Sequence, residues 1–243
     1  MNSLLMAFQF LTTLPLKIKE VNDEKIANSM IFFPVVGLFL GFFLLGVDRL
    51  LLIFNFSQVV SNIIIVITLI IITGGMHLDG LSDTADAFLS GKSKEEMLLI
   101  MRDSHIGVMG ALSLISIILL KTGLLMSLGA ASKVNALVLM CVLSRWSAVL
   151  SAFLFSYARQ DGKAKAFINT INTKILIFST LLAVLFIFAI WQMQALLVMS
   201  VIASWVYLSG KFISKKLGGI TGDTLGATIE ISEIIVLFLI CIR

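Results

Sequence analysis

The segment from residue 74 to 86 carries three aspartates whose spacing could support chemistry. Asp79, Asp83 and Asp86 stand at positions i, i+4 and i+7, which places their carboxylates on one face if the segment is a helix. Like charges on successive turns repel one another, so a divalent cation would stabilise this face. Oxygen-only ligands suit Mg²⁺ or Mn²⁺ better than zinc. We therefore predict a magnesium site at these aspartates, with Asp79 and Asp83 also acting in catalysis.

The competing interpretation is an acidic loop exposed to solvent, because Gly74, Gly75 and Gly80 argue against one long regular helix. The aspartates directly follow an apolar run, however, and acidic residues so close to a membrane are costly unless they serve a function. Their position therefore favours the metal site.

The chain has two histidines, and each lies beside an acidic residue: His77 near Asp79, and His105 near Asp103. A lone histidine is more often a structural residue than a catalyst, and neither has the spacing of a zinc pair. Their shared setting predicts a role in the site all the same. We assign His77 to catalysis and His105 to substrate binding.

The segment MRDSHIG, residues 101–107, adds groups suited to phosphate. Arg102 offers a planar guanidinium that can hold phosphate oxygens, and Asp103 offers a further oxygen ligand; both are predicted to bind substrate. The alternative is a helix start with Asp103 or Ser104 as the N-cap, and the two interpretations can hold together.

A glycine-rich segment covers residues 217–227 and precedes an apolar run with two glutamates. Such a loop exposes backbone N–H groups that can cradle phosphate. It predicts substrate contacts at Gly222 and Thr224 and two further metal ligands, Asp223 and Glu230.

Two arginines complete the candidate set. Arg145 stands in the middle of an apolar run, where a cation costs at least ~2.5 kcal/mol, so it should face the interior and pair with an acid or a substrate anion. Arg159 is either a topology anchor or a phosphate contact. Acids for a metal, arginines and a glycine-rich loop together predict displacement at a phosphate, in which a carboxylate takes the proton of the attacking hydroxyl.

The elements that position these residues must lie in a membrane. Hydrophobic residues make up 59% of the 243 residues and charged residues only 13%, and the mean hydropathy is +1.07. We predict an all-α polytopic bundle of about six to seven transmembrane helices, forming one domain over residues 1–243. The seven apolar runs are Ile31–Phe54, Val59–Ile72, Ile106–Leu128, Val134–Phe155, Ile175–Ile190, Ala195–Leu208 and Ile229–Ile242.

The basic residues predict the orientation. If the N-terminus is cytoplasmic, the inside segments carry thirteen Lys and Arg residues against two outside, Lys133 and Arg243. The candidate site then faces the cytoplasm from the plasma membrane. No basic run with interleaved aromatics points to nucleic acid, and Cys141 and Cys241 lack the spacing of a disulfide framework or thiolate site. The thirteen Lys and Arg residues of the predicted inside segments are Lys17, Lys19, Lys25, Lys92, Lys94, Arg102, Arg159, Lys163, Lys165, Lys174, Lys211, Lys215 and Lys216.

Five motifs resemble the cobalamin synthases in order and approximate spacing: FPVVG, GGMHLDGLSDTADA, MRDSHIG, YARQDG and LGGITGDTLGATIE. They run from about residue 33 to 233, nearly the whole chain. The resemblance implies an adenosylcobinamide-GDP ribazoletransferase that requires Mg²⁺. Its substrates would be adenosylcobinamide-GDP and α-ribazole or its 5′-phosphate, and its products adenosylcobalamin or its phosphate and GMP.

The sequence departs from the family pattern at His105, where arginine is usual, at Met76, where a larger apolar residue is common, and at Ala87, where glycine is usual. Two other functions stay open. A membrane phosphotransferase acting on a lipid acceptor would expect a DG-x-x-AR pattern, and Asp79-Gly80 is followed by Leu-Ser-Asp-Thr instead. A transporter would place its acids near the bilayer midplane. An oligomer is possible.

Overall fold

The computed structural model describes residues 2–16, 22–162 and 164–242, so Lys17, Lys19, Lys163 and Arg243 of the charge count lie outside the described residues. Within these ranges the regular elements are helices, apart from one isolated bridge between Tyr157 and Ile220. The helices are α1 (Asn2–Leu11), α2 (Asp23–Ser29), the 3₁₀ turn η1 (Met30–Phe32), α3 (Phe33–Ile53), α4 (Gln58–Thr73), α5 (Met76–Leu89), α6 (Lys94–Ile100), α7 (Val108–Met126), α8 (Ala130–Leu154), α9 (Lys165–Thr170), α10 (Thr173–Leu217) and α11 (Gly222–Cys241).

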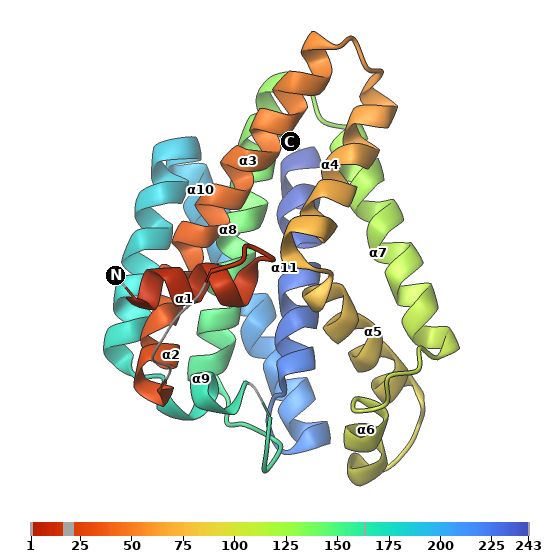
Figure 1. The fold of residues 1–243 in the computed structure, drawn as a ribbon, viewed down its shortest axis with the longest axis vertical. Coiled ribbons are helices and arrows are strands. Elements are labelled where there is room, and N and C mark those ends of the chain that lie inside the picture. Colours follow the sequence, from red (N-terminus) through yellow and green to blue (C-terminus); the bar gives the residue numbers. More distant parts are fainter. Residues whose placement is uncertain (1, 17–21, 163, 243) are drawn as a thin grey trace.

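The molecule is a helix bundle with α8 and α11 in its interior. Figure 1 shows α11 running through the middle, with α10 on the left and α7 on the right. In the most apolar window of α8, 83% of the residues are buried, against 22% for α7 and α10. The outer helices therefore present their apolar side chains to lipid, as an integral membrane protein requires. The all-α prediction is confirmed.

Five helices in the described residues are long and apolar enough to cross a membrane, and six if the bent pair α4 and α5 forms one span. The predicted runs 175–190 and 195–208 are the two halves of α10, which breaks at Trp191 and Gln192, where the backbone angles are non-helical. Figure 1 shows the first half rising at the left edge and the second half returning toward α11. One continuous apolar tract therefore supplies two crossings.

The acidic segment is a helix, so the carboxylates share a face as predicted, and the acidic-loop alternative is wrong. Gly80 lies within this helix, and the other two glycines precede it. Gly74 and Gly75 both adopt left-handed backbone conformations, with φ of 66° and 67°, which residues other than glycine rarely adopt. They turn the chain by 91° between α4 and α5.

Small residues then let α5 lie directly against α11. A Cβ atom on Gly80 would come within 2.7 Å of the carbonyl oxygen of Asp223, and one on Gly226 within 3.1 Å of the carbonyl oxygen of His77. Side chains at either glycine would hold the two helices apart. This close approach brings the aspartates of α5 next to the N-terminus of α11.

Candidate active site

Asp79 and Asp83 form the accessible part of the acidic face. Asp79 is exposed and Asp83 is half-buried, and Asp83 lies within electrostatic range of Asp79, Asp223 and Arg159. Among the described residues, neither Asp79 nor Asp83 has a hydrogen bond or ion pair. Two carboxylates without partners, one turn apart on a rigid helix, are free to receive a cation or a proton.

Asp223 joins them through a different element and is held by an arginine. Arg159 Nη2 donates to Asp223 Oδ2 at 2.6 Å, and the Arg159 side chain is only 10% exposed. Backbone hydrogen bonds around the Tyr157–Ile220 bridge hold the two loops side by side. The N–H of Ala158 donates to the carbonyl oxygen of Ile220 at 2.9 Å, and the N–H of Ile220 donates to the carbonyl oxygen of Ser156 at 2.8 Å. This placement favours the phosphate-contact interpretation of Arg159 over a solvent-exposed topology anchor.

The glycine-rich segment begins α11. Thr221 is the N-cap, and its hydroxyl and that of Thr224 each accept the other residue's backbone N–H in a capping box. Thr224 is buried and serves the helix start, so its predicted substrate contact stays a prediction without support from its surroundings. Gly222 lines a neighbouring cleft.

Asp86, predicted as the third ligand on α5, has another role in the structure. Its two carboxylate oxygens accept hydrogen bonds from the backbone N–H groups of Gly107 and Gly110, each at 2.8 Å. Asp86 therefore caps the N-terminus of α7 from α5, the helix that packs beside it. The residue at the α7 N-cap position is Gly107; the alternative in which Asp103 or Ser104 forms that cap is wrong.

This geometry predicts that Asp86→Asn destabilises the protein by about 1 kcal/mol, because an amide can accept only one of the two N–H groups well. Turnover per folded molecule should stay within a few-fold of the wild type. Thermal unfolding and specific activity of the purified variant test both parts. Complete loss of turnover in a folded variant would restore Asp86 as a metal ligand.

The loop before α7 is exposed and carries three predicted substrate contacts. Arg102, Asp103 and His105 all face solvent, and His105 Nδ1 lies 2.6 Å from Asp103 Oδ1. This hydrogen bond raises the pKa of His105 above its ordinary value. Arg102 acts electrostatically on Tyr157, as do Arg159 and Asp223, so this loop lies beside the acidic cluster and adds positive charge there.

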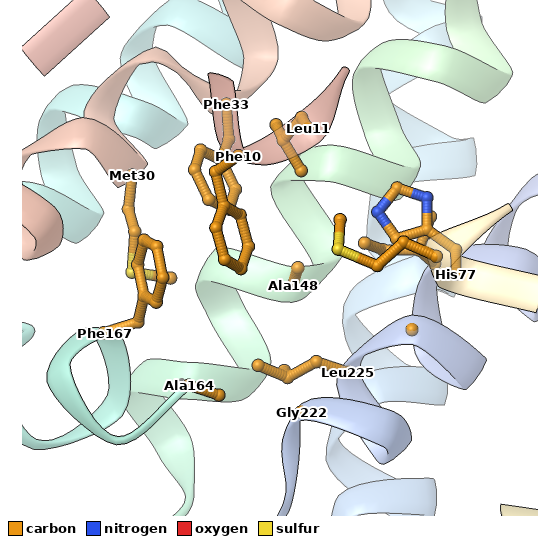
Figure 2. Close-up of a pocket in the computed structure, with 13 residues that line it drawn as sticks. Phe10, Leu11, Met30, Phe33, His77, Ala148, Ala164, Phe167, Gly222 and Leu225 are labelled. Carbon is orange, nitrogen blue, oxygen red and sulfur yellow. The ribbon is translucent and has the colours of Figure 1, made fainter. Parts of the chain in front are cut away.

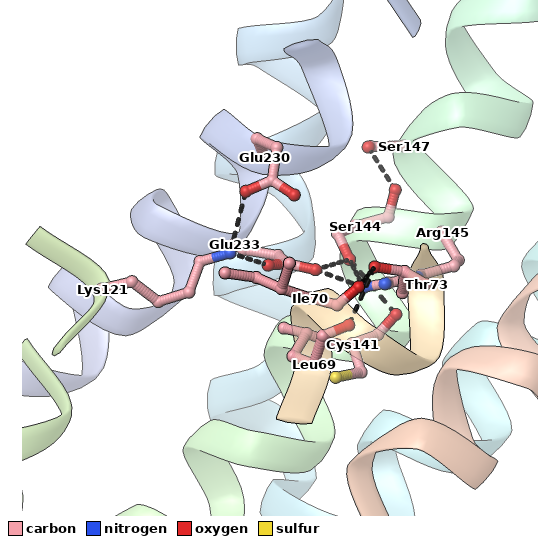
Figure 3. A network of polar contacts seen from close by, with 10 residues as sticks. All are labelled: Leu69, Ile70, Thr73, Lys121, Cys141, Ser144, Arg145, Ser147, Glu230 and Glu233. Carbon is pink, nitrogen blue, oxygen red and sulfur yellow. Dashed lines mark hydrogen bonds and ion pairs between the residues drawn. The ribbon is translucent and has the colours of Figure 1, made fainter. Parts of the chain in front are cut away.

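Arg145 and Glu230 are separated from this cluster. Figure 3 shows a buried network in which Lys121 donates to Glu230 at 2.8 Å and to Glu233 at 2.5 Å, while Arg145 pairs with Glu233. Arg145 is fully buried, so its predicted interior position and acid partner are confirmed. Glu230 lies seven residues beyond Asp223, roughly 10 Å along α11, and its partner is Lys121; its metal role stays a prediction without support here.

His77 lies at the edge of an apolar cleft. The side chain is 3% exposed, and neither ring nitrogen has a hydrogen-bond partner among the described residues. Figure 2 shows it facing the cleft together with Leu11, Ala148 and Leu225. The aromatic side of this cleft comes from α1, α3 and α9: Phe33 begins the FPVVG motif, whereas no motif covers Phe10 or Phe167.

The donor set fits a metal only in part. Among the described residues no group of three or more His, Cys, Asp or Glu side chains could hold a metal ion. Mg²⁺, however, is usually bound through one or two carboxylates together with substrate phosphates. The two partner-free carboxylates of Asp79 and Asp83 match that mode, which needs no complete cage in the protein alone.

Comparison with known proteins agrees with the motifs. A family model described as Cobalamin-5-phosphate synthase matches residues 3–241. The chain is similar to the adenosylcobinamide-GDP ribazoletransferase of Fusobacterium nucleatum, with 38% identity covering 98% of this chain and 96% of the relative. It is likewise similar to that of Thermodesulfovibrio yellowstonii, with 37% identity covering 99% and 95%. No solved structure matches the chain.

Proposed function

The chain belongs to the cobalamin-5-phosphate synthase family and is a transferase of cobalamin biosynthesis; we propose the following reaction and site residues for it. The reaction joins adenosylcobinamide-GDP to α-ribazole, or to its 5′-phosphate, with release of GMP. The observation that carries the assignment of the site is the pair of partner-free carboxylates on α5 beside the Arg159–Asp223 ion pair.

The bond changes follow from the substrates. A ribose hydroxyl oxygen of α-ribazole bonds to the phosphorus nearer cobinamide, and the bond from that phosphorus to the bridging oxygen breaks. GMP leaves with the bridging oxygen. The hydroxyl proton passes to the carboxylate of Asp79 or Asp83, because neither carboxylate forms a hydrogen bond or ion pair with a described residue.

The cations hold the diphosphate. Arg159 is fixed by Asp223 at 2.6 Å, so its remaining N–H groups can point at phosphate oxygens without loss of side-chain entropy on binding. Arg102 adds a second guanidinium from the loop before α7. Mg²⁺, when bound by Asp79 and Asp83 together with the diphosphate, supplies charge neutralisation and polarises the phosphoryl oxygens.

The same charge pattern supports the proposed orientation, with the site facing the cytoplasm from the plasma membrane. The site arginines and the exposed lysines of α6 and the end of α10 belong to the predicted inside segments. The predicted outside lysine, Lys133, is buried beside Asp48. Positive charge exposed near the site thus agrees with the positive-inside rule.

The experiment that tests the function is incubation of the protein in membranes with adenosylcobinamide-GDP, α-ribazole and Mg²⁺. We expect GMP and a corrinoid carrying the lower ligand, and neither product without the metal. Flux of substrate across the membrane with no release of GMP would support a transporter and overturn the proposal.

His105 gives the reaction a pH dependence. The pKa of His105 is raised by its hydrogen bond to Asp103, so the imidazolium is retained to higher pH and its charge is lost as the pH rises through the raised pKa. If the imidazolium contacts the diphosphate, the KM for adenosylcobinamide-GDP should rise by roughly a few-fold between about pH 6 and about pH 9, because the charge of His105 is lost over this range. In His105→Arg this rise should disappear, because arginine stays charged; an unchanged profile in the variant contradicts the contact.

A further inference from the structure

We propose that the apolar cleft beside His77 binds the aromatic base of α-ribazole, and that His77 is a specificity-determining residue for that base. The inference rests on the proposed function and adds a place for one of its two substrates. It assigns to His77 a role in binding, in place of the catalytic role predicted from sequence.

The cleft has the lining of a small-molecule site: the described residues that form its walls are mostly apolar, with one polar side chain. It is open to solvent on one side, and its empty space of about 470 Å³ includes that opening. One wall is aromatic: the ring centroids of Phe10 and Phe167 lie 4.3 Å apart, and that of Phe33 lies 6.2 Å from Phe10. Figure 2 shows this wall opposite His77. A flat apolar ring can pack against these faces and edges.

His77 is the one polar side chain among the described residues that line the cleft. Only 3% of the residue is exposed to solvent, and neither ring nitrogen has a hydrogen-bond partner among the described residues. A buried polar atom without a partner is costly, by about 1–3 kcal/mol. The dimethylbenzimidazole base of α-ribazole is flat and apolar and has one free ring nitrogen. That nitrogen can accept the N–H of the imidazole and satisfy it.

The cleft adjoins the carboxylates at the right place for the attached sugar. Met76, which lines the cleft, and Asp79 and Asp83 stand at i, i+3 and i+7 on α5 and therefore share a face. On α11, Gly222 lines the cleft and Asp223 follows it directly. A base in the cleft therefore places its ribose beside the acidic cluster, where the hydroxyl must lose its proton.

The other parts of the substrates fit this cleft poorly. Guanine carries several hydrogen-bonding groups on its edges, and burying them beside a single imidazole would leave most unpaired. The corrin ring is far larger than the cleft. A lipid tail would fill the apolar space but would leave His77 without a partner, so the observations favour the base.

The test fills the cleft and measures binding without turnover. Ala148 is buried and lines the cleft, so Ala148→Leu places a larger side chain in the empty space. The probe is free 5,6-dimethylbenzimidazole, measured by its fluorescence with protein in lipid nanodiscs. We expect affinity to fall at least about tenfold in Ala148→Leu and to be unchanged in Phe212→Ala, whose aromatic contact is Phe88, away from the cleft.

A second variant tests the imidazole and covers the case in which Ala148→Leu fails to fold. The affinity for dimethylbenzimidazole divided by that for 2,3-dimethylnaphthalene, which has no ring nitrogen, should be about 2- to 10-fold higher in the wild type than in His77→Leu. This ratio isolates the hydrogen bond of the imidazole from the difference in hydrophobicity of the two probes. An unchanged ratio in His77→Leu, or probe affinity unchanged in folded Ala148→Leu, overturns the inference.

Kinetics separate this inference from the proposed function. If the wild type releases GMP, Ala148→Leu should raise the KM for α-ribazole at least about tenfold and leave the KM for adenosylcobinamide-GDP unchanged. Equal KM increases for both substrates would contradict the base site and leave the function standing. Absence of GMP release, with probe binding that is lost in Ala148→Leu, would contradict the function and leave the base site standing.

Discussion

Asp79→Asn is expected to reduce the rate of GMP release at least about 10³-fold, or about 4 kcal/mol of transition-state stabilisation. Asp79 is the more exposed of the two carboxylates on α5 without a partner, and the amide can neither hold a divalent cation with the same strength nor take a proton. The loss should appear mainly in kcat, because the arginines that hold the diphosphate are unchanged. Initial rates of GMP release with purified protein in nanodiscs measure it.

A matched control is Glu95→Gln on α6, an exposed carboxylate near the same end of the bundle. It should keep wild-type turnover, which excludes a general effect of lost negative charge. Thermal unfolding must show that Asp79→Asn is folded, and we expect little change because no described residue forms a hydrogen bond with that carboxylate. Near-normal turnover in the folded variant would remove Asp79 from the site.

Glu233→Gln is expected to lower the free energy of unfolding by about 3–5 kcal/mol. Lys121, Arg145, Glu230 and Glu233 form a buried set of two positive and two negative charges. The amide leaves this set with one uncompensated positive charge in the interior of the bundle, where water cannot solvate it. Denaturant titration in mixed micelles, followed by tryptophan fluorescence, measures the change.

Two further variants make the result specific. Ser232→Ala removes a buried hydroxyl without a hydrogen-bond partner among the described residues, so it should have little effect at a neighbouring position. The double variant Arg145→Leu with Glu233→Leu removes one charge of each sign and leaves the Lys121–Glu230 pair. It should be less destabilised than Glu233→Gln, and additive losses from the two single leucine variants would contradict the pairing.

The membrane helices could be predicted from the sequence because lipid demands long apolar runs with their backbone bonds satisfied internally. The seven runs correspond to α3, α4, α7, α8, the two halves of α10, and α11. The helical face of Asp79 and Asp83 was predicted from its period. The sequence did not reveal the 91° turn at Gly74 and Gly75, since a glycine pair permits many backbone conformations.

The partners of the charged residues were harder to predict, because packing decides them. Asp86 fits the spacing of its neighbours, yet it contacts N–H groups 21 and 24 positions later in the chain. Glu230 follows a glycine-rich loop in sequence but pairs with Lys121, which is 109 positions away. Charged residues inside the apolar runs indicated that such a network would be buried. They did not indicate which residues would pair.

The cleft was missed for a different reason. Its aromatic residues, Phe10, Phe33 and Phe167, lie far apart in the sequence and individually resemble any apolar residue of a membrane protein. Only the packing of α1 and α9 against the bundle brings them together. Of the residues that line the cleft, His77 and Gly222 were singled out from sequence as site residues. The proposed function of His77 in binding depends on neighbours that the sequence does not identify.

The buried charge network also depends on the order in which the helices enter the membrane. Lys121 belongs to α7 and Arg145 to α8, whereas both acids that neutralise them belong to α11, near the end of the chain. During synthesis two cations therefore enter the bilayer before any partner exists, each at a cost of at least ~2.5 kcal/mol. This charge network can therefore form only after α11 has joined α7 and α8.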